Sequence, residues 1–221
     1  MADPFDETHE YGHLRALMVE RYVEARGVVD PRVLEAMRQV PRHRFVPPAL
    51  AAKAYGVSAL PIGAKQTISQ PYIVGRMIEL LELEGSEKVL EIGTGTGYQA
   101  AVLSRVAARV FSIERINELA LKAVELLRVL RVQNVSIKVF DGTYGWSDQA
   151  PFDRIIVAAA APEIPEPLVA QLTRRGKLVL PVGAEGKQRL ARVTRVATRL
   201  QIEDCGPAEF VPLIGRFGWK E

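Results

Sequence analysis

The clearest chemical signal in this chain of 221 residues is a run of three alternating glycines at positions 93, 95 and 97. They lie in the segment VLEIGTGTGY, residues 89–98, directly after a short apolar run. Glycines allow a sharp turn and let a ligand approach the backbone closely, and the start of a following helix offers free N–H groups to a negative group. The segment therefore predicts a strand–loop–helix turn that binds a small anionic molecule.

The spacing of these glycines distinguishes two classes of cofactor. Dinucleotide-binding loops prefer glycine at the first, third and sixth positions, because the pyrophosphate rests on the helix start. Here the third glycine, Gly97, is at position five, and Tyr98 takes the sixth. This spacing resembles the loop of S-adenosylmethionine-dependent methyltransferases, where a methionine carboxylate replaces the pyrophosphate. We expect S-adenosylmethionine to bind and S-adenosylhomocysteine to be the product, although a turn without a ligand can show the same triplet.

Acidic residues end the next two predicted strands. Glu114 can accept hydrogen bonds from both ribose hydroxyls, and Asp141 can accept one from the adenine amine, while Gly142 leaves room for the ring. Alone, each is an ordinary strand-end carboxylate or Asp-Gly turn. At successive strand ends, where ligands of open α/β sheets bind, they support the same pocket. The cofactor-binding residues expected in this region are Glu91, Gly93, Thr94, Gly95, Gly97, Glu114, Arg115, Asp141 and Gly142.

Apolar periodicity predicts a Rossmann-like α/β fold around this loop. Short apolar runs predict strands at 89–92, 110–114, 135–139, 155–158 and 178–182, and helical patterns cover 97–106, 119–130 and 165–172. This alternation implies a mainly parallel, seven-stranded sheet with helices on both faces. After Gly186 the helical patterns stop, and further strands are expected at 190–196, 200–202 and 210–213, antiparallel at one edge.

The first third of the chain reads as a helical extension. Apolar residues at helical spacing predict two short helices before residue 41 and another from Pro71, while residues 41–63 are expected to be rich in loops. We expect one compact domain, in which residues 1–86 form the extension that covers substrate and cofactor and residues 87–221 form the methyltransferase core.

Composition favours a soluble enzyme. The net charge is only +3 and no basic tract interleaved with aromatic residues is present, so we expect no nucleic-acid partner. The single cysteine excludes an internal disulfide, and the three histidines lack metal-ligand spacing, so no metal is expected. Without a secretory signal or an apolar run of membrane-spanning length, we expect a cytoplasmic monomer that does not bind a membrane.

The methyl acceptor is indicated by a resemblance. Residues 67–71, TISQP, resemble the signature of the protein-L-isoaspartate O-methyltransferase family, and the likeness continues in order along most of the chain. Further matching segments are PRHRFVP at 41–47, the loop at 91–98, DGT at 141–143, APFD at 150–153, AAAP at 159–162, LVLPVG at 178–183 and FVPL at 210–213.

The resemblance implies a protein-repair enzyme. It implies methyl transfer, by in-line displacement, to the free α-carboxylate of L-isoaspartyl residues in damaged proteins and peptides. The ester then forms a succinimide that returns partly to L-aspartate. Ser69 matches the catalytic serine. Thr67, Ile68 and Gln70 match the segment that borders cofactor and substrate, and Val211, Pro212 and Leu213 match, with Ser69, the substrate-binding residues.

The chemistry of Ser69 fits this role. A carboxylate is already ionised at neutral pH and needs no general base, so the enzyme must mainly hold it in line with the methyl group. A hydroxyl donates one hydrogen bond to it without neutralising it. The competing interpretation is that Ser69, two residues before Pro71, caps the following helix.

Other functions on the same fold remain open at this point. A cytosine-C5 methyltransferase is disfavoured because Cys205 is not in a Pro-Cys pair, and an adenine-amino enzyme because residues 158–162 read AAAAP. A small-molecule methyltransferase and a non-catalytic S-adenosylmethionine-binding protein are further alternatives, and Tyr98 disfavours a nicotinamide dehydrogenase.

Four residues depart from the pattern expected for the family. Phe140 replaces a glycine, Gln70 an alanine and Tyr72 a histidine, and the sequence offers no reason for a charge at Arg154.

Overall fold

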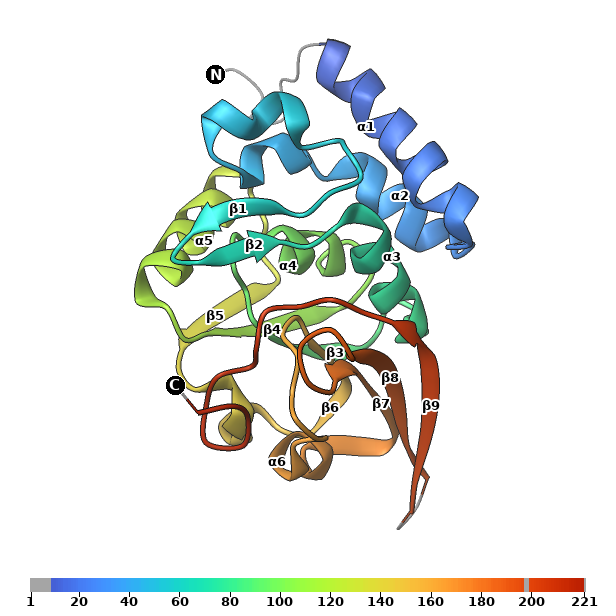
Figure 1. Ribbon diagram of the computed structural model, residues 1–221, viewed down its shortest axis with the longest axis vertical. Helices are drawn as coiled ribbons and strands as arrows, with labels where there is room; N and C mark the ends of the chain where they lie inside the picture. Colours follow the sequence, from blue (N-terminus) through green and yellow to red (C-terminus); the bar gives the residue numbers. More distant parts are fainter. Residues whose placement is uncertain (1–8, 197–198, 221) are drawn as a thin grey trace.

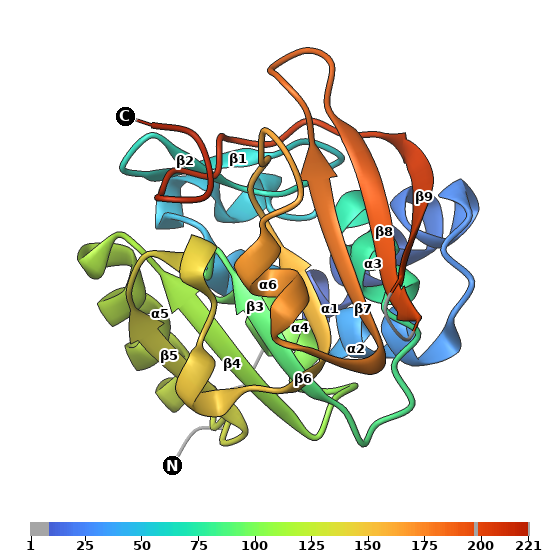
Figure 2. The same cartoon turned by 90° about the horizontal axis from the view of Figure 1, so that it is seen from below.

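A seven-stranded sheet forms the centre of the computed structural model, which describes residues 9–196 and 199–220. The order in space is β5 (Val135–Val139), β4 (Arg109–Glu114), β3 (Lys88–Ile92), β6 (Phe152–Val157), β7 (Leu172–Val182), β8 (Arg189–Val196) and β9 (Arg199–Pro207). Strands β5 to β7 in this order are parallel, and β8 and β9 are antiparallel at one edge (Figure 2). The predicted mainly parallel sheet is confirmed.

The strand order reverses at the centre of this sheet. From β3 the chain moves outward through β4 to β5, and then returns to place β6 on the other side of β3. In open α/β sheets such a reversal opens a crevice at the carboxyl ends of the central strands, where ligands bind. Gly93 follows β3 and Glu114 ends β4, so the predicted cofactor residues lie at this crevice.

Helices cover both faces of the sheet, but unequally. The bounds are α1 (His9–Tyr22), α2 (Pro31–Gln39), α3 (Pro71–Leu80), α4 (Tyr98–Leu103), α5 (Asn117–Val129) and α6 (Glu166–Ala170). Because side chains alternate along a strand, Val89 and Val110 share one apolar cluster with α1 to α5, whereas Leu90 and Phe111 share the other with α6. Figure 1 shows the N-terminal helices and α3 above the sheet and α6 below it.

Close packing joins the N-terminal helices to α3. Met18 of α1, Met37 of α2 and Met77 of α3 are fully buried in one cluster. At Gly75, in the middle of α3, an added Cβ would lie 2.8 Å from Val23 Cγ1, so no larger residue fits without a shift. The cluster is continuous with Val89 of the sheet, and the predicted helical extension thus packs directly on the core.

The segment expected to be loop-rich, residues 41–63, is more ordered than predicted. It contains the 3₁₀ helices η2 (Arg42–Phe45) and η3 (Pro48–Lys53) and the strand β1 (Leu60–Gly63), which pairs with β2 (Gln66–Ile68). The two-residue turn of this hairpin is Ala64-Lys65, with φ of 49° and 57°. Such turns usually use Asn or Gly. The sequence therefore carries no signal for the hairpin.

Other boundaries differ from the predictions, and one predicted strand is wrong. The helix predicted at 97–106 ends at Leu103, and the strand predicted at 178–182 already begins at Leu172. Residues 210–213 do not join the sheet edge. They form one parallel bridge, between Ala160 and Pro212, across the carboxyl end of β6, in which Ala160 N donates to Val211 O and Leu213 N donates to Ala160 O.

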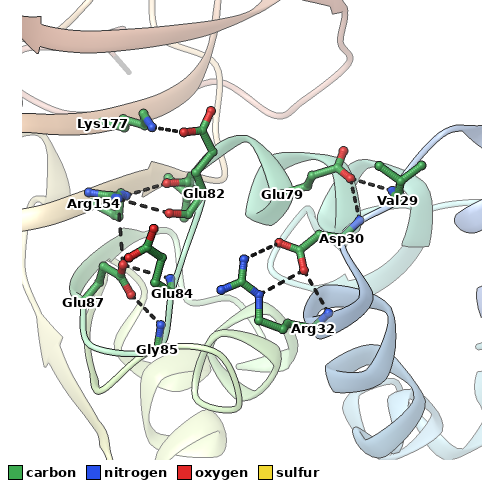
Figure 3. A network of polar contacts seen from close by, with 11 residues as sticks. Val29, Asp30, Arg32, Glu79, Glu82, Glu84, Gly85, Glu87, Arg154 and Lys177 are labelled. Atoms are coloured by element: carbon green, nitrogen blue, oxygen red, sulfur yellow. Dashed lines mark hydrogen bonds and ion pairs between the residues drawn. The ribbon is translucent and has the colours of Figure 1, made fainter.

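Arg154 supports the opposite end of the sheet (Figure 3). Its guanidinium donates to the carbonyls of Leu81 and Glu82, just after α3, and lies 3.9 Å from the Glu87 carboxylate. Glu82 also pairs with Lys177 of β7. The Arg154 guanidinium, for which the sequence offers no reason, therefore donates hydrogen bonds to carbonyls at the C-terminal end of α3.

The described ranges, 9–196 and 199–220, contain no helix that is both long and apolar enough to cross a membrane. They also contain no cluster of three or more His, Cys, Asp or Glu side chains arranged to hold a metal. Residues 1–8, part of the N-terminal stretch in which we expect no secretory signal, lie outside the described residues.

Candidate active site

A cavity lies over the carboxyl ends of β3 and β4, and segments far apart along the chain line it. Most of the lining comes from the β1–β2 hairpin with Ser69, the glycine loop with the start of α4, the end of β4 and the C-terminal segment, residues 208–220. Single residues of other segments complete it: Val74, Gly142, Ala158 and Ala159. Figure 2 shows the hairpin and the C-terminal segment crossing the same end of the sheet. The predicted site residues that line the cavity are Thr67, Ile68, Ser69, Gly93, Thr94, Gly95, Glu114, Arg115, Gly142, Val211, Pro212 and Leu213.

The glycine loop adopts a backbone that only glycine tolerates well. Gly93, Gly95 and Gly97 have φ of 92°, 54° and 87°, in the left-handed region. Gly93 N donates to Ile113 O, and Gly97 is the N-cap of α4, tight against α5. The loop therefore presents backbone rather than side chains to the cavity. Gly97 itself does not line the cavity; its role is to turn the chain into α4.

Glu114 is held rigidly at the cavity wall. Its Oε2 accepts from Gly95 N at 2.8 Å and its Oε1 from Ile116 N at 2.9 Å. A carboxylate has about four lone-pair sites, so each oxygen can accept a further hydrogen bond. This geometry suits a pair of neighbouring hydroxyls, as on a ribose.

Glu91 lies beneath the loop rather than at the cavity surface. Its side chain is fully buried, and Ser112 Oγ, which also hydrogen-bonds Thr94 Oγ1, donates to its Oε2. Burial raises the pKa of Glu91 to about 8; the nearby Glu114 adds to the rise and the bond from Ser112 opposes it. Glu91 therefore supports the loop through Ser112 and Thr94, and its direct contact with the cofactor stays a prediction.

Asp141 is engaged by hydrogen bonds within the protein, and its contact with the adenine amine stays a prediction. Its Oδ1 accepts from Thr143 N and Oγ1, and its Oδ2 accepts from Arg216 N of the C-terminal segment at 2.8 Å. Asp141 does not line the cavity, whereas Gly142 does. A Cβ on Gly142 would lie 2.4 Å from Ile92 Cγ2, so only glycine fits this wall.

Ser69 lines the cavity between β2 and α3 and does not cap the helix. The N-cap of α3 is Gln70, whose side chain makes no cap hydrogen bond, and Pro71 occupies the first helical turn. Proline needs no N–H partner there. The helix-cap interpretation of Ser69 is therefore wrong. Gln70 does not line the cavity, and its expected cofactor contact has no geometric support.

The C-terminal segment holds the predicted substrate-binding residues against the loop after β6. Ala160 N donates to Val211 O, Leu213 N donates to Ala160 O, and Trp219 Nε1 donates to the same carbonyl. In an extended segment, the backbone groups of neighbouring residues face opposite sides. Val211 O and Leu213 N face Ala160, so the carbonyl of Pro212, which lies between them in the chain, points away from Ala160.

The residues present fit S-adenosylmethionine. The cavity has a glycine backbone surface, a preoriented carboxylate at Glu114, and apolar walls from Ile92, Ile113 and Ile116 that suit a purine. Sequence reasoning missed Ile62 and Gln66 of the hairpin, and Ile214, which also line the cavity. Tyr98 and Gln99 also line the cavity, and their position directly after the glycine loop is the sequence feature from which this could have been predicted.

Comparison with known proteins decides the family. The family model described as protein-L-isoaspartate(D-aspartate) O-methyltransferase matches residues 14–218. The chain belongs to this family. Its relatives include a protein-L-isoaspartate O-methyltransferase from Syntrophus aciditrophicus, 54% identical over 209 residues, covering 93% of this chain and 96% of the relative. One from Geobacter metallireducens is 54% identical over 206 residues, covering 93% and 95%.

Solved structures agree with the family fold. A protein-L-isoaspartate O-methyltransferase superposes with a TM-score of 0.82 at 27% identity, covering 94% of this chain and 67% of that one. A second one, described as putative and solved from Plasmodium falciparum in complex with S-adenosyl-L-homocysteine, gives a TM-score of 0.75 at 24% identity, covering 89% and 96%. This second likeness shows the fold alone.

Proposed function

We propose that this protein methylates the free α-carboxylate of L-isoaspartyl residues in damaged proteins and peptides, with Ser69 as the catalytic residue. The methyltransferase activity and the use of S-adenosylmethionine follow from membership of the family. The observation that carries the residue assignment is the cavity itself, which joins Ser69 and residues 211–213 to the glycine loop and Glu114.

The cofactor supplies, when bound, an electrophilic methyl group on a sulfonium. Glu114 and the loop glycines orient it, because their hydrogen-bond acceptors and backbone are already fixed by bonds within the protein. Preformed groups of this kind lose little freedom when the ligand binds.

The acceptor needs orientation rather than activation. Its carboxylate is ionised at neutral pH, so the Ser69 hydroxyl donates a hydrogen bond to it and leaves the charge in place. The C-terminal segment offers the carbonyl of Pro212 to an N–H of the substrate backbone, and proline adds no competing donor there. Holding both partners in line lowers the entropic part of the barrier.

Labelled methyl transfer tests this function. The protein is incubated with methyl-labelled S-adenosylmethionine and with matched isoaspartyl and aspartyl peptides, and RNA is the control. We expect label only from the isoaspartyl peptide, released as volatile methanol after mild base. Equal labelling of both peptides, or labelling of RNA alone, refutes the proposal, and cofactor binding without any transfer favours a non-catalytic protein.

We further propose that the protein acts as a cytoplasmic monomer and folds as one domain. One chain contributes every residue that lines the cavity, which supports a monomer as the working form. The apolar cluster shared by α1 to α5 and the sheet supports a single folding unit for the extension, 1–86, and the core, 87–221. Light scattering at micromolar concentration tests whether the protein is a monomer, and the mass of a dimer contradicts that proposal.

A further inference from the structure

Arg42 is a charged residue in an unusual place. Its side chain is completely buried in η2, and it is among the largest fully buried side chains of the protein. Within the described part of the chain no carboxylate forms an ion pair with it, and its Nη1 has no hydrogen-bond partner there. Burial lowers the pKa of the guanidinium, but arginine keeps its charge in proteins. An unpaired buried charge reduces stability, so its presence calls for a compensating role.

The guanidinium connects three segments, two of which line the cavity, at Ser69 and at Tyr98. Its Nη2 donates to the carbonyl of Ser69 at 2.7 Å, and its Nε donates to the carbonyl of Ala54 at 2.8 Å. Its central carbon lies 4.7 Å from the ring centre of Tyr98, the first residue of α4 after the glycine loop. The Arg42 side chain thus links Ser69, the residue proposed for catalysis, to the start of α4.

The shape of the group matters as much as its charge. Arginine presents its N–H donors in a rigid planar fork, so two carbonyls are fixed relative to one another. A bond to the carbonyl of Ser69 fixes the peptide plane that follows this residue. Because Cα belongs to that plane, the direction in which the Ser69 side chain leaves the backbone is restricted as well.

We propose that Arg42 is a positioning residue for methyl transfer. It holds the Ser69 backbone against Tyr98, so that the hydroxyl meets the acceptor carboxylate in line with the methyl group. This inference rests on the proposed role of Ser69.

Arg154 provides a matched control for substitutions of Arg42. It also donates to two backbone carbonyls, those of Leu81 and Glu82, but at the far end of α3 from Ser69. Arg42→Gln and Arg154→Gln therefore remove the same kind of interaction from the two ends of one helix. Arg42→Lys keeps the charge but loses the planar arrangement of N–H donors. If Arg42→Gln does not fold, Arg42→Lys takes its place in every comparison.

The measurements are kcat with an isoaspartyl peptide, Kd for S-adenosylmethionine, and thermal stability. For Arg42→Gln we expect kcat to fall about 10- to 100-fold, as misplacement of a reacting group does, with a Kd within about threefold of the wild type. For Arg154→Gln we expect a comparable loss of stability with near-normal kcat. Equal effects of the two substitutions on kcat at matched stability overturn the proposal.

A double substitution separates this inference from the proposed function. If Arg42 acts through Ser69, Ser69→Ala combined with Arg42→Gln has the same kcat as Ser69→Ala alone, since coupled residues are not additive. Additive losses refute the positioning role. A slow Ser69→Ala with an unimpaired Arg42→Gln refutes only the Arg42 proposal, whereas a Ser69→Ala enzyme of normal kcat refutes the role of Ser69 and this inference together.

Discussion

At the residue scale, the proposed function gives different roles to Glu114, which is proposed to hold the cofactor, and to Ser69, which is proposed to orient the acceptor. Ser69 should affect use of the acceptor and not binding of the cofactor. For Ser69→Ala we expect kcat to fall about 10- to 100-fold, because the carboxylate is no longer held in line with the methyl group and misplacement of a reacting group lowers the rate on about this scale. Binding of S-adenosylmethionine, followed by calorimetry, should stay near normal. Unchanged kcat contradicts the catalytic assignment.

Glu114 should show the opposite behaviour. Glu114→Gln replaces one carboxylate oxygen by an amide donor, so the charge-assisted bonds expected to the ribose hydroxyls are lost. We expect Kd for S-adenosylmethionine to rise about 10- to 100-fold, because a hydrogen bond to a charged group contributes about 1.5–3 kcal/mol. Glu118→Gln, on the exposed surface of the neighbouring α5, is the control and should bind normally. Equal affinity of the two variants argues against the ribose contact.

Glu91 makes stability depend on pH in an unusual direction. Its pKa is about 8 in the folded protein against an ordinary 4.5, so between these values the folded protein keeps a proton that the unfolded chain has released. This contribution to stability is complete below about pH 4.5 and is lost as pH rises toward 8. We expect Glu91→Gln to remove that slope in denaturant titrations without cofactor, while Glu118→Gln keeps it. A slope that survives in Glu91→Gln disproves the assignment.

At the element scale, the C-terminal segment acts as a wall that long-range hydrogen bonds hold in place. Asp141 and Thr143 accept from its backbone, and Trp219 anchors it to Ala160. The substrate contact proposed for residues 211–213 therefore depends on a segment fixed from the cofactor side of the cavity.

Removing the Trp219 anchor should weaken peptide binding. Trp219→Phe deletes the indole N–H but keeps most of the ring. One hydrogen bond contributes about 1 kcal/mol, so we expect KM for the isoaspartyl peptide to rise about fivefold, with little change in cofactor affinity. Trp146→Phe makes the same change where the ring packs on Phe111, away from this segment. Peptide kinetics that do not distinguish the two variants count against the anchoring role.

At the scale of the whole molecule, one apolar cluster unites the N-terminal helices with the sheet. Met37→Ala in α2 removes a fully buried side chain and should lower the free energy of unfolding by about 2–5 kcal/mol. Because the cluster is shared, circular dichroism and the fluorescence of Trp146 and Trp219 should report one coincident transition. A separate early transition of the helices means that the extension folds independently.

The sequence alone determined the features that depend on local spacing. Alternate glycines, which permit positive φ, specified the loop and its cofactor, and the alternation of apolar runs with helical patterns specified the parallel sheet. Glu114 was placed correctly because the carboxyl ends of parallel strands must meet at one edge. The acceptor came from a resemblance spread along the chain, and the comparisons confirmed that family.

Only the tertiary structure decided the contacts between distant segments. The Ala64-Lys65 turn has no residue that favours its geometry, so the hairpin left no trace in the sequence. Asp141 bonds Arg216, Arg154 bonds the end of α3, and Arg42 bonds Ser69. Each pair is far apart along the chain, and no periodicity or motif records which carbonyl or N–H a side chain will meet once the chain has folded.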